Sequence, residues 1–215
     1  MIVRGGNYRM KKASFVSTLV LMGSCFLLAP TLFAANPLAT QLWEVVLDQG
    51  SGTVEFNAVG RPSALKIHGK GEAPKGLMRI ESGILKGSTQ FALDTLDTGI
   101  PLRNRHMKEK YLETGKFPQA KLTFDPVNLG IQRIEDLKTE KTVPFEGKLS
   151  LHGVEKPVKG IIKVSLDGNK ASARTEFALK ISDFQVPTPG FAGITMAEDV
   201  GIVVESKAPL RMKTP

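Results

Sequence analysis

The three histidines are the side chains of this sequence best suited to acid–base or metal chemistry, and they are widely separated: His68, His106 and His152. None of them stands in an HxH or HExxH motif, the spacings that bring two imidazoles onto one metal ion. The chain has a single cysteine, Cys25, so it can hold neither an internal disulfide nor a cysteine-only zinc site. We therefore expect no catalytic residue and no metal site, unless the fold brings the histidines together.

Two carboxylate pairs and one glycine-rich stretch could also carry chemistry. The pairs Asp94/Asp97 and Glu109/Glu113 could serve as general acid and base, but no GxSxG or other nucleophile motif accompanies them. The stretch His68–Gly76 lacks both GxxxxGK[ST] and GxGxxG, and no helix pattern follows it. We interpret this stretch as a hairpin connection and not as a phosphate loop.

Basic side chains are concentrated in one short segment: Arg103, Arg105, His106, Lys108 and Lys110. Beside the mouth of a binding site they could bind a phosphate or quinone headgroup, because arginine presents planar hydrogen-bond donors. They could equally form a solvated face with ion pairs to Glu109 and Glu113. His106 could donate to a headgroup or bond to local backbone carbonyls.

Residues 1–34 have the features of a secretory signal peptide. Four cations and no acid occupy residues 1–12, and an uncharged apolar run with small residues at its end follows. We expect cleavage after Ala34, a periplasmic or secreted protein, and one domain over residues 35–215. Two alternatives stay open, because the run is long enough for an uncleaved membrane anchor and Cys25 could carry a lipid.

The remaining chain is only mildly basic. Four of the 29 Lys and Arg residues lie in the signal segment, so 25 remain against 21 Asp and Glu, a net charge of +4. These cations are mixed with acids, which argues against nucleic-acid binding. The absence of cysteine after residue 34 suits an oxidising compartment, because no thiol can mispair.

Alternating apolar and polar residues dominate this chain, a pattern typical of antiparallel strands with one dry face. The clearest runs are 143–151, 158–166 and 171–181, and the first two read as a hairpin. Weaker runs bring the total to about eight to ten strands: 43–48, 53–59, 64–68, 77–82, 84–96, 121–127 and 200–210.

The sequence therefore predicts an all-β fold, either a sandwich or a closed barrel. Closure removes exposed sheet edges, and a barrel of about eight strands has room for packed side chains or one small ligand. Small residues on the dry faces, such as Gly147 and Gly160, could leave space for an occupant or allow close packing. The only helix that we expect covers Arg103–Glu113, which is rich in helix formers.

Several segments recur in the order and spacing of a known family: Thr98–Gly99, Arg103–Met107, Tyr111–Leu112, Phe117–Pro118, Leu122–Phe124, Gly147–Val154, Lys156–Val158, Phe177–Leu179, Ser182–Phe184 and Glu198–Val200. The set resembles the YceI-like family of lipocalin-like β-barrels over about Trp43–Ala208. The chain departs from the family at Asn104, where Asp is usual, at Gln185, where Gly is usual, and over residues 57–76.

The resemblance implies an elongated antiparallel barrel with one short helix, whose interior holds a long isoprenoid or similar amphiphilic lipid. It implies a periplasmic binding protein with no established catalytic residue and no cofactor besides such a lipid. A transient membrane contact and a homodimer stay open. We expect these residues to contact the lipid: Phe91, Leu93, Arg103, His106, Leu122, Phe124, Leu149, Leu151, Ile162, Val164, Phe177 and Leu179.

Two other functions remain open from the residues alone. The protein could be a periplasmic enzyme that acts on a lipid or small apolar molecule with His106 as acid or base. It could also be a structural β-domain with a filled interior, since alternating strands usually pack. The apolar loop Gln185–Glu198 could plug one end of the barrel or move as a flap over a ligand.

Overall fold

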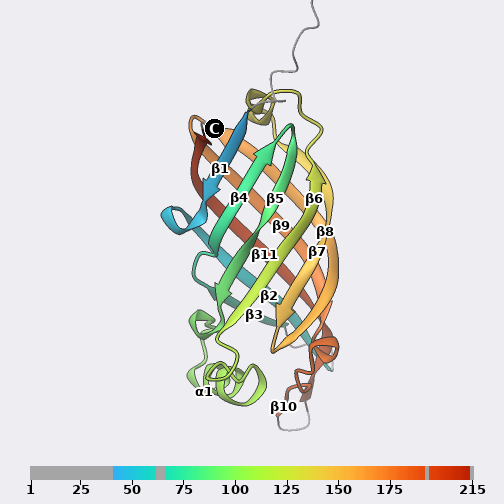
Figure 1. The fold of residues 1–215 in the computed structure, drawn as a ribbon. Coiled ribbons are helices and arrows are strands. Elements are labelled where there is room, and N and C mark those ends of the chain that lie inside the picture. Colours follow the sequence, from blue (N-terminus) through green and yellow to red (C-terminus); the bar gives the residue numbers. More distant parts are fainter. Residues whose placement is uncertain (1–40, 62–65, 192–193, 214–215) are drawn as a thin grey trace, which may run out of the picture. The chain divides into compact units, whose positions relative to one another are not determined.

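The computed structural model describes residues 41–61, 66–191 and 194–213 (Figure 1). The chain divides after Ala34, and all of these residues belong to the second unit, Ala35–Pro215. The expected signal peptide lies outside the described residues, so its cleavage stays a prediction.

Strands make up most of the fold. They are β1 (Leu42–Val46), β2 (Ser51–Arg61), β3 (Lys66–Gly71), β4 (Lys75–Glu81), β5 (Ile84–Ala92), β6 (Gln119–Asn128), β7 (Lys141–Leu151), β8 (Val154–Asp167), β9 (Lys170–Lys180), β10 (Gly190–Phe191) and β11 (Ile194–Lys213). The helical segments are η1 (Leu47–Gln49), η2 (Leu93–Thr95), α1 (Pro101–His106), η3 (Met107–Tyr111), η4 (Ile134–Lys138) and η5 (Ile181–Phe184).

Eight of these strands close into an antiparallel barrel, which confirms the predicted fold (Figure 1). Each is hydrogen-bonded to the next in the order β1-β4-β5-β6-β7-β8-β9-β11, and β11 pairs again with β1 to complete the ring. β2 and β3 extend the same sheet, because β2 pairs with β11 over Thr195–Lys207 and β3 pairs with β2.

The hairpin between β7 and β8 follows the alternation of the sequence. Leu151 pairs with Val154 across a two-residue turn, in which His152 and Gly153 have φ angles of 53° and 77°. Positive φ at both central positions is the conformation of a type I′ turn, whose twist suits a hairpin. The interpretation of residues 68–76 as a hairpin connection is wrong, because β3 pairs with β2 and not with β4.

The expected helix is present but begins two residues early. α1 starts at Pro101, a residue whose fixed φ suits the first turn of a helix, and it continues into η3, which ends at Tyr111. Within the described ranges, no helix is long and apolar enough to cross a membrane.

The end of the barrel away from α1 is filled by the protein's own side chains. The connection before β7 contains η4, whose Ile134 and Leu137 are only 3% and 0% exposed and belong to the buried core. Farther inside, the ring centroid of Phe145 lies 5.1 Å from that of Phe124 and 6.1 Å from that of Phe177. These three rings occupy the middle of the barrel.

Gly147 and Gly160 allow close packing and do not make room for an occupant. A Cβ atom at Gly160 would lie 2.2 Å from the carbonyl oxygen of Glu176 and 2.8 Å from Cε1 of Phe145. A Cβ atom at Gly147 would lie 2.4 Å from the carbonyl oxygen of Thr123. The two glycines therefore let backbone and an aromatic ring approach closely where any larger residue would force them apart.

Candidate ligand-binding cavity

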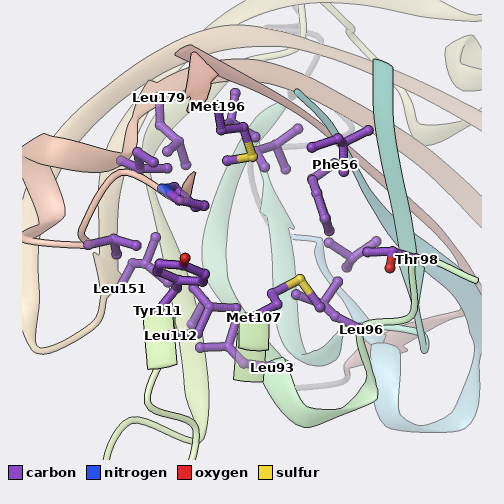
Figure 2. Close-up of a pocket in the computed structure, with 18 of the residues that line it drawn as sticks. Phe56, Leu93, Leu96, Thr98, Met107, Tyr111, Leu112, Leu151, Leu179 and Met196 are labelled. Atoms are coloured by element: carbon purple, nitrogen blue, oxygen red, sulfur yellow. The ribbon is translucent and has the colours of Figure 1, made fainter. Parts of the chain in front are cut away.

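The half of the barrel next to α1 contains a cavity of about 470 Å³ (Figure 2). Inward-facing apolar side chains of β2, β5, β6, β7, β9 and β11 form its wall. Few polar side chains reach it: Thr89, Thr98, Arg103, His106, Tyr111 and Thr195. Volumes of about 300–1,000 Å³ are typical of sites for small organic ligands, and an interior this apolar suits an occupant held by the hydrophobic effect.

The cavity ends part-way along the barrel. Phe177 lines its inner end, and the rings of Phe145 and Phe124 continue the packed core beyond that point. The hollow therefore does not run through the whole barrel. Among the described residues, the partly exposed lining residues Ile100 and Leu102 place the opening of the cavity at the end that α1 covers.

Nine of the twelve residues expected to contact a lipid line this cavity: Phe91, Leu93, Arg103, His106, Leu122, Leu149, Leu151, Phe177 and Leu179. The other three, Phe124, Ile162 and Val164, do not line it and lie in the packed half, where they are 6%, 2% and 4% exposed. Alternation placed them correctly on the inward face. The distance along each strand, which alternation does not report, decides whether an inward residue meets the cavity or the packed core.

Several cavity residues were not identified from the sequence: Phe56, Ile67, Met107, Tyr111, Leu112, Met196, Val200, Ile202 and Val204. Phe56 and Ile67 lie on β2 and β3, in or beside the stretch that matches the family poorly. Val200, Ile202 and Val204 alternate along a weaker run, where the apolar Val203 between them obscures the inward face. Met107 and Tyr111 lie one helical turn apart, which was the available signal for an inward helix face.

The helical cap, which we define as Pro101–Tyr111 (α1 and η3), covers the open end of the cavity. Figure 2 shows Met107 and Tyr111 directed into the cavity, opposite Leu179 and Met196. The Tyr111 hydroxyl lies 3.4 Å from both the amide nitrogen and the carbonyl oxygen of Gly190, so it joins the cap to β10. The loop before β11 thus helps to close the mouth, while its movement as a flap stays a prediction.

A hydrogen-bond network holds the beginning of the cap. The Arg103 guanidinium donates from Nε to the Thr98 hydroxyl at 2.8 Å and from Nη2 to the Thr98 carbonyl oxygen at 2.7 Å. Asn104 Oδ1 accepts from the amide and the hydroxyl of Thr98, and Asn104 Nδ2 donates to Asp97 Oδ1 at 2.6 Å. The Gly99 amide, and second the Asn104 side chain, lower the pKa of the Asp97 carboxyl.

A buried histidine holds the end of the cap. His152 lies 3.1 Å through Nε2 from Glu113 Oε2 and 3.2 Å through Nδ1 from the Phe184 carbonyl oxygen, and its ring packs on Phe117 at 4.5 Å between centroids. Both partners are acceptors, so both bonds form together only when each ring nitrogen carries a proton. The hydrogen bond from Lys116, and second that from His152, lower the pKa of Glu113.

His106 differs from His152 because it lines the cavity and bonds to no residue that the structure describes. Its imidazole is therefore available to a polar group of a ligand. The described part of the chain contains no cluster of three or more His, Cys, Asp or Glu side chains able to hold a metal ion.

The comparison with protein families decides the assignment of this barrel. The model of the YceI-like domain matches residues 45–208. The chain belongs to the YceI-like family. Among curated relatives, a UPF0312 protein of Pseudomonas savastanoi pv. phaseolicola is 29% identical over 124 residues, which cover 54% of this chain and 59% of that protein. The chain thus spans about three fifths of the length of the curated relatives it matches.

Solved structures share the fold of this YceI-like chain. A polyisoprenoid binding domain from Saccharophagus degradans superimposes with a TM-score of 0.58 at 16% identity, covering 80% of this chain and 98% of that domain. BcnA of Burkholderia cenocepacia gives 0.58 at 17% identity, covering 76% and 99%. Identities this low establish the shared barrel and leave the ligand to be argued from this chain's own cavity.

Two of the three departures from the YceI-like pattern, Gln185 and Asn104, have local explanations. Gln185, where glycine is usual, has φ 57° and ψ 23° at the end of η5, a left-handed conformation that glycine adopts without strain. Asn104, where aspartate is usual, supplies the amide donor to Asp97 that a carboxylate lacks. Asparagine at position 104 therefore suits this chain, because its amide can donate to the neighbouring Asp97.

We predict that Asn104→Asp loosens the cap. The substitution replaces a donor 2.6 Å from Asp97 Oδ1 by a second carboxylate, so a hydrogen bond is exchanged for repulsion. Amide exchange of Pro101–Tyr111, measured by mass spectrometry, should accelerate several-fold. The double variant Asp97→Asn/Asn104→Asp restores one amide donor and one carboxylate, and should recover most of the protection. Equal exchange in the single variant and the wild type would contradict this role of Asn104.

Acidification should loosen both ends of the cap. Asp97 and Glu113 have pKa values lowered in the folded state, so their contribution to stability is complete above the unfolded pKa and is lost as the pH falls through the folded pKa. The loss therefore begins below about pH 4, the ordinary range of carboxyl groups. Hydrogen exchange corrected for intrinsic rates should show the cap exposed at low pH before the β7–β8 hairpin. Simultaneous loss of both regions would argue against this local linkage.

Proposed function

We propose that this protein is a non-enzymatic binding protein that holds a long isoprenoid-like amphiphilic lipid, for storage or transport in the periplasm or outside the cell. The observation that carries the proposal is the apolar cavity of about 470 Å³, closed at its inner end and covered by the helical cap. The fold shared with a structure described as a polyisoprenoid binding domain supports the same class of ligand.

The driving force for such binding is removal of the lipid's apolar surface from water. Transfer of apolar surface gains about 25 cal/mol per Å², so burial of roughly 300 Å² of an isoprenoid chain contributes on the order of 7 kcal/mol. The wall needs no directional bond for this gain. Because Phe177 closes the inner end, the cavity depth sets the length of chain that can be held.

The polar end of the ligand belongs at the mouth. The cap lines the cavity with three polar side chains, Arg103, His106 and Tyr111. The lining residues on β6, β7 and β9 are all apolar. Arg103 uses two of its five N–H donors on Thr98 and is thereby fixed in place, whereas the His106 imidazole forms no hydrogen bond with a described residue. We propose that its imidazole donates a hydrogen bond to the headgroup and so fixes the direction in which the lipid enters.

Binding accounts for this site better than turnover does. A histidine that acts as acid or base is normally oriented by a second polar group, and His106 has no such partner in the described ranges. The described residues that line the cavity include no Asp, Glu or Cys, and the described part of the chain holds no cluster able to bind a metal ion. The cavity in the half of the barrel next to α1 argues against the other alternative, a filled structural core.

Native mass spectrometry of protein purified without detergent tests the proposal. A bound mass that dissociates on collisional activation, and that organic extraction identifies as a long-chain amphiphile, is the expected result. Empty protein that also takes up no fluorescent prenyl probe would contradict it. N-terminal sequencing of the same sample, if it begins at Ala35, would establish the proposed export and cleavage.

A further inference from the structure

The rim of the cavity mouth carries exposed apolar side chains. Ile100 and Leu102 are 48% and 46% exposed, and both also line the cavity. The large exposed apolar residues elsewhere in the described part lie on strands of the sheet: Val59, Ile161 and Met212. Two neighbouring apolar side chains at the opening of a cavity mark a surface for contact with an apolar phase.

The same rim is basic. Residues 100–117 contain five Lys or Arg and two Glu, a net charge of +3. One of those acids, Glu113, is already paired with Lys116 and His152. By contrast, Arg105, Lys108 and Lys110 form no ion pair with any residue the structure describes. Asp97 lies near enough to Lys108 for the lysine's charge to lower the pKa of that carboxyl. Arg105 and Lys110 are exposed, so the mouth presents apolar groups beside a net positive charge.

We infer that the helical cap docks on an anionic lipid bilayer and that the cavity exchanges its ligand there. The inference rests on the proposed function and names the partner of the same site. A lipid that leaves a membrane for a distant protein must expose its whole apolar chain to water. A mouth seated on the bilayer avoids that exposure, with Ile100 and Leu102 in the interfacial region and the cations against lipid phosphates.

A bilayer fits this rim better than another protein or a second copy of the chain. A stable protein interface buries about 1,200–2,000 Å², and two exposed apolar side chains offer far less. Two copies of the cap facing each other would bring like charges together. An anionic bilayer needs only a small apolar contact, and it gains roughly fivefold in partitioning for each Lys or Arg near its surface.

The test compares two triple variants that lose the same charge. The cap variant is Arg105→Gln/Lys108→Gln/Lys110→Gln, and none of these side chains lines the cavity. The control variant neutralises exposed lysines on β5, η4 and β9: Lys86→Gln/Lys138→Gln/Lys170→Gln. Residues 1–34 are identical in all samples, so any membrane affinity of that segment is common to them.

Donor vesicles carrying a fluorescent prenyl probe provide the readout. They contain phosphatidylcholine alone or mixed with phosphatidylglycerol. Wild type and control variant should bind the anionic vesicles and take up the probe faster from them. The cap variant should bind about 100-fold more weakly, from three lost cations, with correspondingly slower transfer. Equal transfer in both variants, or no preference for anionic vesicles, would overturn docking by the cap.

A second measurement separates this inference from the proposed function. Uptake of the same probe is measured from a dilute dispersion without vesicles. If every variant takes up the probe normally from the dispersion, and the cap and control variants accept it equally fast from vesicles, membrane docking is contradicted and lipid binding is not. Absence of uptake in the wild type contradicts the lipid-binding function itself.

Discussion

Ala120→Trp should abolish lipid binding and leave the barrel folded. Ala120 lies on β6 opposite Phe91, and its small side chain lines the cavity. A tryptophan buries about 150–250 Å², and an occupant that loses that contact loses at least about 4 kcal/mol, roughly a thousandfold in Kd. The indole would fill empty apolar space, so we expect an unchanged or higher Tm.

Titration with a fluorescent prenyl probe measures the effect, and thermal unfolding shows whether the variant is folded. Lys121→Trp is the matched control, because Lys121 is the next residue of the same strand and its side chain is exposed on the outer face. The control should bind the probe as the wild type does. Unchanged affinity in Ala120→Trp, with intact unfolding behaviour, would show that the ligand lies elsewhere.

Phe145→Ala should be the most destabilising single change in the core. Phe145 is 2% exposed and contacts the rings of both Phe124 and Phe177. Truncation of a buried phenylalanine typically lowers the free energy of unfolding by about 3–5 kcal/mol, because it removes contacts and leaves a cavity. Denaturant unfolding measures this loss. Phe56→Ala, at a half-buried ring on the cavity wall, should lose clearly less.

The same variant should change the preferred length of the ligand. Phe145 lies directly behind Phe177, the inner end of the cavity, so its removal extends the hollow into the packed half. Phe145→Ala should therefore favour longer prenyl probes than the wild type, at a temperature where it is still folded. An unaltered preference for probe length would indicate that the inner end is set by other residues.

Alternation in the sequence predicted which side chains face inward, but not how far the cavity reaches. Leu122 and Phe124 are both inward on β6, two residues apart, yet only Leu122 lines the cavity, while the ring of Phe124 packs against Phe145. The difference depends on ring packing between strands β6, β7 and β9. Such packing between strands is a property of the closed barrel and has no signature in any one strand.

His152 shows a second limit of sequence patterns. Continuing the alternation of β7 by one residue would place His152 on the polar outer face, yet it is 9% exposed. The positive φ of the turn redirects its side chain toward Glu113 and the Phe184 carbonyl oxygen. Those partners come from the segment after the cap and from η5, which are brought together only when the barrel closes.

The basic segment was predicted either as a headgroup site or as a solvated face with ion pairs, and the structure divides it. Arg103 and His106 line the cavity, with Arg103 bonded to Thr98. Of the flanking cations, Arg105 and Lys110 are exposed and Lys108 is half-buried, and none of them forms an ion pair with Glu109. Helical spacing explains this division, since positions 103 and 106 share one face of the cap.

A crystal structure of the protein purified without detergent tests the central claim most directly, because it shows what occupies the cavity. The account predicts continuous elongated electron density that begins beside Phe177, passes Ala120 and Leu149, and ends in a polar group near His106. A cavity collapsed onto its own side chains, or one holding only ordered water, would contradict it.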